Sequence, residues 1–166
     1  MKKPIKHCYW VVPGKVLAGE HPVGLSDLTP SENLEALKKE SVTTFIDLTS
    51  EQEGLASYQP LLDEQAYHRF AITNIGTPSS PQITTAILDL IDQQATKEGV
   101  VYVHCRGGVG RTGTIIGCWL ARKGFKGSNA LAQLNELWMH NPKSAKTESP
   151  ETQAQKDYIL AWEEHA

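Results

Sequence analysis

Cysteine is scarce in this chain of 166 residues and occurs three times, as Cys8, Cys105 and Cys118. The number is odd, and the positions form neither a CxxC pair nor a zinc ligand set, so we expect no disulfide framework and no structural metal. We expect Cys118 to pack inside a helix and Cys8 to lie in packing or at the surface. Free cysteines suit a reducing compartment, which favours a cytoplasmic protein.

Long apolar runs and excess positive charge are also missing. No run reaches the roughly 18–20 residues that cross a bilayer, and no apolar secretory segment follows the basic start at residues 1–7, so we expect neither a membrane partner nor export. The 16 basic and 19 acidic residues give a formal net charge of −3, which argues against a nucleic-acid partner. With no repeat or linker visible, residues 1–166 fit a single domain.

Short β-branched runs alternate with helical patterns along the chain. This alternation predicts an α/β fold with a central, mostly parallel sheet of four or five strands flanked by helices. The helix that begins around Thr29-Pro30-Ser31-Glu32 has a hydroxyl cap, a proline in the first turn and an early acid. Strands are expected at 9–12, 16–18, 42–48, 67–72 and 100–103, and further helices at 55–65, 82–96, 111–123, from 128 and from 149–151.

One stretch, VHCRGGVGRTG at residues 103–113, stands apart. It joins the most strand-like run to a helix start through a glycine-rich turn. The backbone N–H groups of such a turn converge, and the helix dipole adds positive potential, so the turn predicts an anion site. The glycines allow the backbone to close around a small anion.

Two side chains give this anion site its chemistry. Cys105 opens the turn, where N–H groups, a helix N-terminus and a guanidinium favour ionisation of a thiol, and the thiolate is the nucleophilic form. Arg111, after five intervening residues, carries the planar fork that binds two phosphate oxygens. A bound phosphoryl group would therefore lie against the sulfur, ready for attack.

The pattern His104-Cys105-x5-Arg111-Thr112 resembles the signature of the cysteine-dependent protein tyrosine phosphatases, and the compact length resembles their small dual-specificity branch. The segment YWVVPG at 9–14 through LAGE at 17–20 resembles the N-terminal hairpin of bacterial and plant phosphatases. The resemblance implies a phosphocysteine on Cys105, phosphoryl binding by Arg111, stabilisation of the leaving thiolate by Thr112 and orientation of the loop by His104. It also implies a phosphate-binding loop made of Arg106, Gly107, Gly108, Val109, Gly110 and Arg111.

What binds this loop follows from the same resemblance. It implies a phosphorylated protein as substrate, and phosphate, sulfate or vanadate as ligands of the loop, with no cofactor. Near the C-terminus, SPETQAQ at 149–155 resembles the segment whose glutamine positions the hydrolytic water. Gln155 is the better match in register and Gln153 the second choice.

The chain departs from the family at the general acid. The family carries an aspartate about thirty residues before the cysteine, and the matching stretch AITNIGTPS at 71–79 has Asn74 there. An amide cannot deliver the proton, and losing a general acid commonly costs about 10²–10⁴-fold in rate. The enzyme would then be slow or restricted to good leaving groups unless another acid serves. The candidates are Glu20, His21, Asp47, Glu51, Glu53 and Glu148.

Several other readings stay open. The protein could be a catalytically weak module that binds phosphoproteins, or a phosphatase for non-protein phosphate esters. A rhodanese-type sulfurtransferase is less favoured because its loop is usually shorter, and a nucleotide P-loop is not expected because Gly-Lys-Ser/Thr is missing at the required spacing. We expect Glu151, Asp157, Glu163 and Glu164 to form a solvated helix face.

Overall fold

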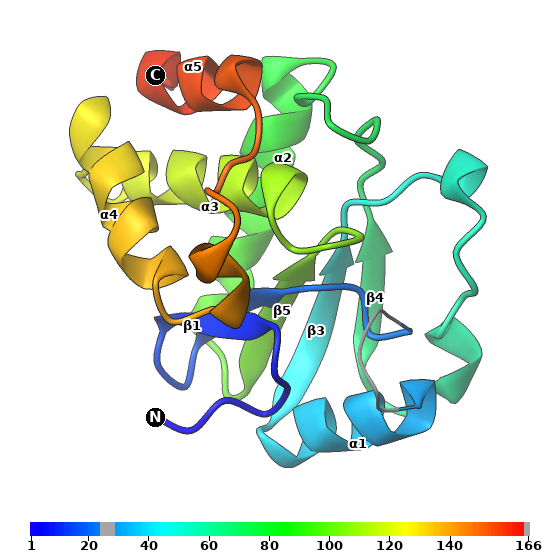
Figure 1. Ribbon diagram of the computed structural model, residues 1–166. Helices are drawn as coiled ribbons and strands as arrows, with labels where there is room; N and C mark the ends of the chain where they lie inside the picture. The colour runs from blue at the N-terminus through cyan, green and yellow to red at the C-terminus, as the bar shows by residue number, and fades with distance from the viewer. Residues whose placement is uncertain (24–28, 165–166) are drawn as a thin grey trace.

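A five-stranded sheet organises the part of the chain that the structure describes (Figure 1). The computed structural model describes residues 1–23 and 29–164. The strand order is β1-β2-β5-β3-β4, with β1 antiparallel to β2 and the other neighbours parallel. The strands are β1 Cys8–Val12, β2 Val16–Gly19, β3 Val42–Asp47, β4 Ala66–Arg69 and β5 Val100–His104. The predicted fold class, a mostly parallel sheet flanked by helices, is confirmed.

Alternating side chains along the strands point to two different cores. On one face, Val101 and Val103 of β5 pack with α2 Pro81–Ala95, α3 Gly110–Arg122, α4 Ser128–Trp138 and α5 Gln153–Ala161. On the other face, Tyr102 packs with Leu34 and Leu37 of α1 Pro30–Lys39. Figure 1 shows α1 alone on its side, with the other helices across the sheet. Both faces of β5 are thus covered, as its continuous apolar run predicts.

Helix α1 begins where the sequence predicts. Thr29 Oγ1 accepts a hydrogen bond from the Glu32 N–H at 3.2 Å, and the Glu32 carboxylate accepts one from the Thr29 N–H at 3.1 Å. This reciprocal capping satisfies two donors at the helix start. No helix in the described ranges, 1–23 and 29–164, is long and apolar enough to cross a membrane.

Two predicted helices need correction. Residues 55–65 contain only the short 3-10 helix Gln59–Leu61, because Pro60 and the exposed polar residues around it present no continuous apolar stripe. The last helix begins at Gln153 with Thr152 as its cap, three residues after Pro150. Ser149 and Pro150 are buried and form part of the loop before the helix. The described residues also contain the 3-10 helices Glu51–Glu53 and Pro142–Ala145.

Candidate functional site

The glycine-rich turn lies where β5 ends and α3 begins, as predicted. It forms the floor of a pocket of about 220 Å³. Cys105, at the carboxyl end of β5, is buried there, and Arg111 lies in the first turn of α3. The pocket thus holds the thiol and the guanidinium of the motif together. Its lining residues are Asn74, Ile75, Cys105, Arg106, Gly107, Val109, Gly110, Arg111 and Glu151.

Neighbouring segments brace the backbone of the turn. Gly108 has φ of +74°, and a Cβ there would come within 2.4 Å of the Gly19 carbonyl carbon, so this position needs glycine. Lys143 Nζ donates to the Gly107 carbonyl at 2.7 Å, and the His21 N–H donates to the Arg106 carbonyl at 3.0 Å. The carbonyls at 106 and 107 are therefore engaged by these segments.

The His104 side chain contacts the main chain of the turn. Its Nδ1 lies 3.0 Å from the Cys105 carbonyl, and its Nε2 lies 2.6 Å from the Tyr58 hydroxyl. Complete burial lowers the pKa of His104, although the nearby Asp47 carboxylate opposes the shift. The geometry is compatible with the orienting role expected from the resemblance, and Tyr58 is a partner that the sequence did not reveal.

Arg111 is held by a bidentate ion pair. Its Nη1 and Nη2 each lie 2.7 Å from an oxygen of Glu53, a residue of the 3-10 helix after β3. Nη1 also donates to the Ile72 carbonyl at 2.9 Å, and Nη2 to Asn74 Oδ1 at 3.2 Å. Glu53, which sequence reasoning considered as a general acid, therefore positions the guanidinium.

The ion pair fixes the charge of both partners. Burial disfavours the charged carboxylate of Glu53, but hydrogen bonds from Arg111 and from the Ser50 backbone outweigh it and lower its pKa. Burial likewise disfavours the Arg111 cation, but the Glu53 carboxylate and the Cys105 sulfur outweigh it and raise its pKa. The guanidinium therefore stays positive beside the thiol.

Thr112 follows Arg111 and is completely buried. Within the described chain its Oγ1 has no hydrogen-bond partner. A buried hydroxyl without a partner costs free energy and calls for an explanation, such as a ligand or a catalytic role. The predicted action of Thr112 on the thiolate is one such explanation.

Gln155 is buried and braces the C-terminal segment. Its Oε1 accepts from the N–H groups of Glu151 and Thr152 at 3.1 Å each, and its Nε2 donates to the Gly76 carbonyl at 3.0 Å. These contacts cap α5 and join it to the turn that carries Asn74. Gln153 is exposed and bonds to Asp157 at 2.9 Å. The positioning of water by Gln155 stays a prediction.

The acids considered as substitutes for the missing aspartate lie away from the pocket lining. Glu20 is buried against His7 and Lys143, and Asp47 accepts from Thr49 and Tyr67. Glu148 is exposed and pairs with Lys156 at 2.7 Å, and Glu51 is exposed. The pocket is instead lined by Glu151, which the sequence assigned to a solvated face. Sequence gave no signal for this because the loop before α5 sets its position.

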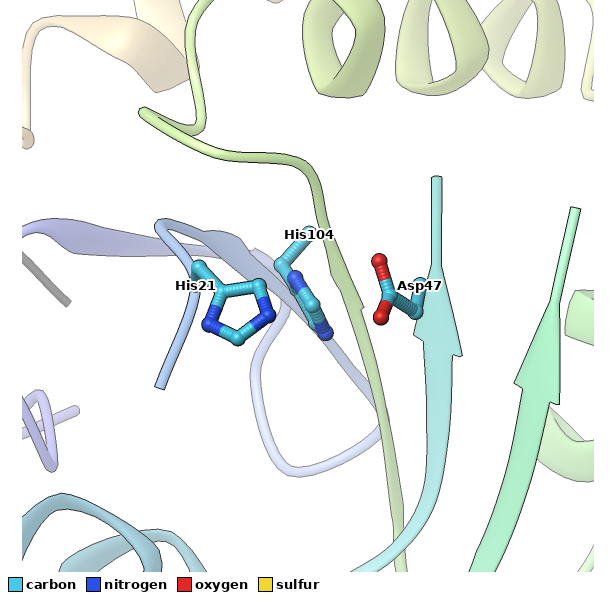
Figure 2. Close-up of side chains that lie close together, drawn as sticks. All are labelled: His21, Asp47 and His104. Atoms are coloured by element: carbon cyan, nitrogen blue, oxygen red, sulfur yellow. The ribbon is translucent and has the colours of Figure 1, made fainter. Parts of the chain in front are cut away.

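A buried cluster of His21, Asp47 and His104 lies beneath the turn (Figure 2). Its ligand atoms lie within 4.8 Å of one another, a spacing that could hold a metal ion. However, Nε2 of His104 bonds to Tyr58, both Asp47 oxygens accept hydrogen bonds, and His21 Nδ1 accepts from the Val23 N–H at 3.1 Å. Each member of the cluster is thus already bound by a neighbouring protein group, which explains the cluster without a metal ion.

The other two cysteines are buried and unpaired, so the packing role predicted for Cys118 agrees with the structure, and Cys8 lies in packing. Burial raises the pKa of Cys8 to about 11, and burial also raises the pKa of Cys118. Both thiols therefore stay protonated near neutral pH.

Comparison with known proteins decides the family. Residues 5–159 match the family described as "Swiss Army Knife protein, DSP-PTPase phosphatase domain". The chain belongs to this phosphatase family. It is 32% identical over 120 residues to the mouse dual specificity protein phosphatase CDC14A, covering 68% of this chain and 19% of that protein. The chain thus spans about a fifth of the length of this curated relative.

Solved structures of phosphatases share the fold. Tk-PTP in its active form superposes with a TM-score of 0.64 at 21% identity, covering 87% of this chain and 88% of the other. Kinase associated phosphatase, with its catalytic site cysteine replaced by serine, superposes with a TM-score of 0.71 at 17% identity, covering 87% and 83%. The chain therefore has the same fold as these two phosphatases.

Proposed function

We propose that the chain, as one domain, hydrolyses phosphomonoesters through a phosphocysteine on Cys105, with phosphotyrosine proteins as the main substrates. The observation that carries this proposal is the pocket in which Cys105 and Arg111 lie together at the start of α3. Phosphoserine and phosphothreonine proteins are further candidates, and the family membership supports them.

The backbone of the loop and three side chains have separate roles in the proposed hydrolysis. Backbone N–H groups of residues 106–110 and the Arg111 guanidinium bind the phosphoryl oxygens, and the Cys105 thiolate attacks phosphorus in line with the leaving oxygen. The S–P bond forms while the P–O bond to the alcohol breaks. Water then attacks phosphorus, the S–P bond breaks, and the Thr112 hydroxyl stabilises the released thiolate. The loop and Arg111 supply the positive charge that a metal would otherwise provide.

Ile75 favours an aromatic substrate. This apolar residue is 61% exposed, lines the pocket and has φ of 58°. A β-branched residue at positive φ is strained, and such strain persists where the surroundings require it, often at functional sites. At this position the side chain would contact the ring of a phosphotyrosine. We expect Ile75→Ala to raise KM for a phosphotyrosine peptide more than for a phosphoserine peptide.

The decisive experiment measures release of an aryl alcohol from its phosphate ester. Wild type should turn over repeatedly, Cys105→Ser should fall to background, vanadate should inhibit and EDTA should not. Equal rates for wild type and Cys105→Ser would refute the proposal. A binding module would show at most one burst of alcohol without turnover, which distinguishes that alternative.

Loop composition, cysteine chemistry and net charge support the remaining assignments. Arg106 is the one basic residue between Cys105 and Arg111, which argues against highly charged inositol phosphates among non-protein esters. The buried free cysteines suit a reducing cytoplasm. The mildly acidic charge supports a substrate other than nucleic acid, and we expect no membrane partner.

A further inference from the structure

The chemistry of the pocket leaves one proton unassigned. When the P–O bond of the substrate breaks, the departing alkoxide or phenoxide needs a proton unless it is already a stable anion. Asn74, at the position where the family carries its acid, has its Oδ1 on Arg111 Nη2 and offers only an amide. A side-chain proton donor would therefore have to be another residue that reaches the pocket.

Glu151 is the one pocket-lining carboxyl among the described residues that is not bound elsewhere. It lines the same pocket as Cys105, Arg111 and Asn74. Its Oε1 lies directly over the start of α3, since a Cβ built on Gly110 would come within 2.8 Å of it. In the described parts of the chain, the carboxylate has neither a hydrogen bond nor an ion pair, and the residue is exposed. It is free to approach a substrate and to exchange protons with water.

The backbone of Glu151 is held in place although its side chain is free. Its N–H donates to Gln155 Oε1 at 3.1 Å. Two residues earlier, Ser149 Oγ donates to the Val109 carbonyl at 2.6 Å and ties the segment to the phosphate-binding loop. A fixed backbone keeps the Glu151 carboxyl within reach of the loop, and its unbonded side chain can still turn toward a bound substrate.

The Glu151 carboxyl lies beside Gly110, the first residue of α3. The other acids near the site are held away from this position. Glu53 is bound to Arg111 through both oxygens, and burial lowers the pKa of His21 to about 4.

We propose that Glu151 is the general acid of this chain, an inference that rests on the proposed phosphatase function. As the Cys105 sulfur forms its bond to phosphorus, the P–O bond to the alcohol breaks and its electron pair goes to the leaving oxygen. The Glu151 carboxylic acid gives its proton to that oxygen. The products are the neutral alcohol, the phosphocysteine and the Glu151 carboxylate.

The test compares two esters that differ in leaving group. Phenyl phosphate needs a proton on its leaving oxygen, whereas dinitrophenyl phosphate releases a stable anion. The measured quantity is kcat/KM, which reports only the steps up to release of the alcohol. We expect Glu151→Gln to lower kcat/KM for phenyl phosphate by about 10²-fold or more and for dinitrophenyl phosphate by less than about threefold.

The matched control is Glu148→Gln, which removes an exposed acid of the same segment that pairs with Lys156. This substitution should leave kcat/KM unchanged for both esters. Equal losses on both esters would assign Glu151 a structural role, and no loss on phenyl phosphate would remove it from the reaction, so either result overturns the inference. If wild type and Cys105→Ser are equally inactive on both esters, the proposed function itself fails.

Discussion

Both oxygens of Glu53 lie 2.7 Å from the terminal nitrogens of Arg111, a residue that is 2% exposed. We expect Glu53→Gln to lower the free energy of unfolding by about 3 kcal/mol because it removes one partner of a buried pair. It should also raise KM for an aryl phosphate because the guanidinium loses its fixed orientation.

Urea denaturation and steady-state kinetics check this expectation. The control is Glu51→Gln, which changes an exposed residue of the same 3-10 helix and should leave both quantities unchanged. A Glu53→Gln protein as stable as wild type would show that the ion pair does not support the fold.

Thr112 should act on the second chemical step. Because its buried hydroxyl has no partner in the described chain, Thr112→Ala should slow breakdown of the phosphocysteine by about 10–100-fold, the value of one hydrogen bond to a charged group. Rapid mixing with dinitrophenyl phosphate should then show a burst of alcohol followed by slow turnover. Thr112→Ser retains the hydroxyl and should behave like wild type. A variant Thr112→Ala with unchanged turnover would contradict the role.

The two central glycines of the loop, Gly107 and Gly108, should differ sharply in how well they tolerate substitution by alanine. A Cβ on Gly108 would come within 2.4 Å of the Gly19 main chain at φ of +74°, whereas one on Gly107 would meet its nearest atom, Lys143 Nζ, at 3.6 Å. We expect Gly108→Ala to abolish vanadate binding and activity, and Gly107→Ala to retain most of both. Vanadate titration measures the difference, and equal effects would show that the loop moves freely.

Asn74→Asp should change kcat and KM in the same direction. A carboxylate at this position would accept from Arg111 Nη2, as the amide does at 3.2 Å, and compete with phosphate. KM for phenyl phosphate should therefore rise. Once phosphate displaces it, the acid can serve as a second proton donor, so kcat on this poor leaving group should rise as well. Unchanged kcat would show that position 74 does not reach the leaving oxygen.

Buried histidine predicts how stability depends on pH. Burial lowers the pKa of His21 from 6.5 to about 4, so below pH 6.5 the unfolded chain takes up a proton that the folded chain refuses. Stability should fall as pH drops from 6.5 towards 4, by up to about 1.4 kcal/mol per pH unit for one histidine. Urea denaturation across this range should show a shallower slope for His21→Asn. The exposed His140→Asn should keep the wild-type slope; the same slope in all three would contradict the assignment.

Sequence patterns predicted the parts of the fold that depend on local chemistry. The structure agrees with the predictions for the strand at residues 100–103, the glycine-rich turn and the start of α3. These features depend on residues that are adjacent in the sequence. The helix predicted for residues 55–65 was wrong because the apolar residues of this segment do not form a helical stripe. The pairing of Glu53 with Arg111 could not be predicted because 58 positions separate them. The place of Glu151 in the pocket lining was not predicted either, because only the path of the loop brings it there.

Residues 149–155, which form the loop before α5 and its first turn, join two parts of the pocket that are far apart in the chain. Ser149 bonds to the loop at Val109, and Gln155 bonds to the Asn74 turn at Gly76. A protein that stops after Glu148 would therefore keep the whole HCRGGVGRT signature and still lose the wall that encloses it. Possession of the signature does not by itself give a complete pocket, because residues 149–155 contribute to it as well.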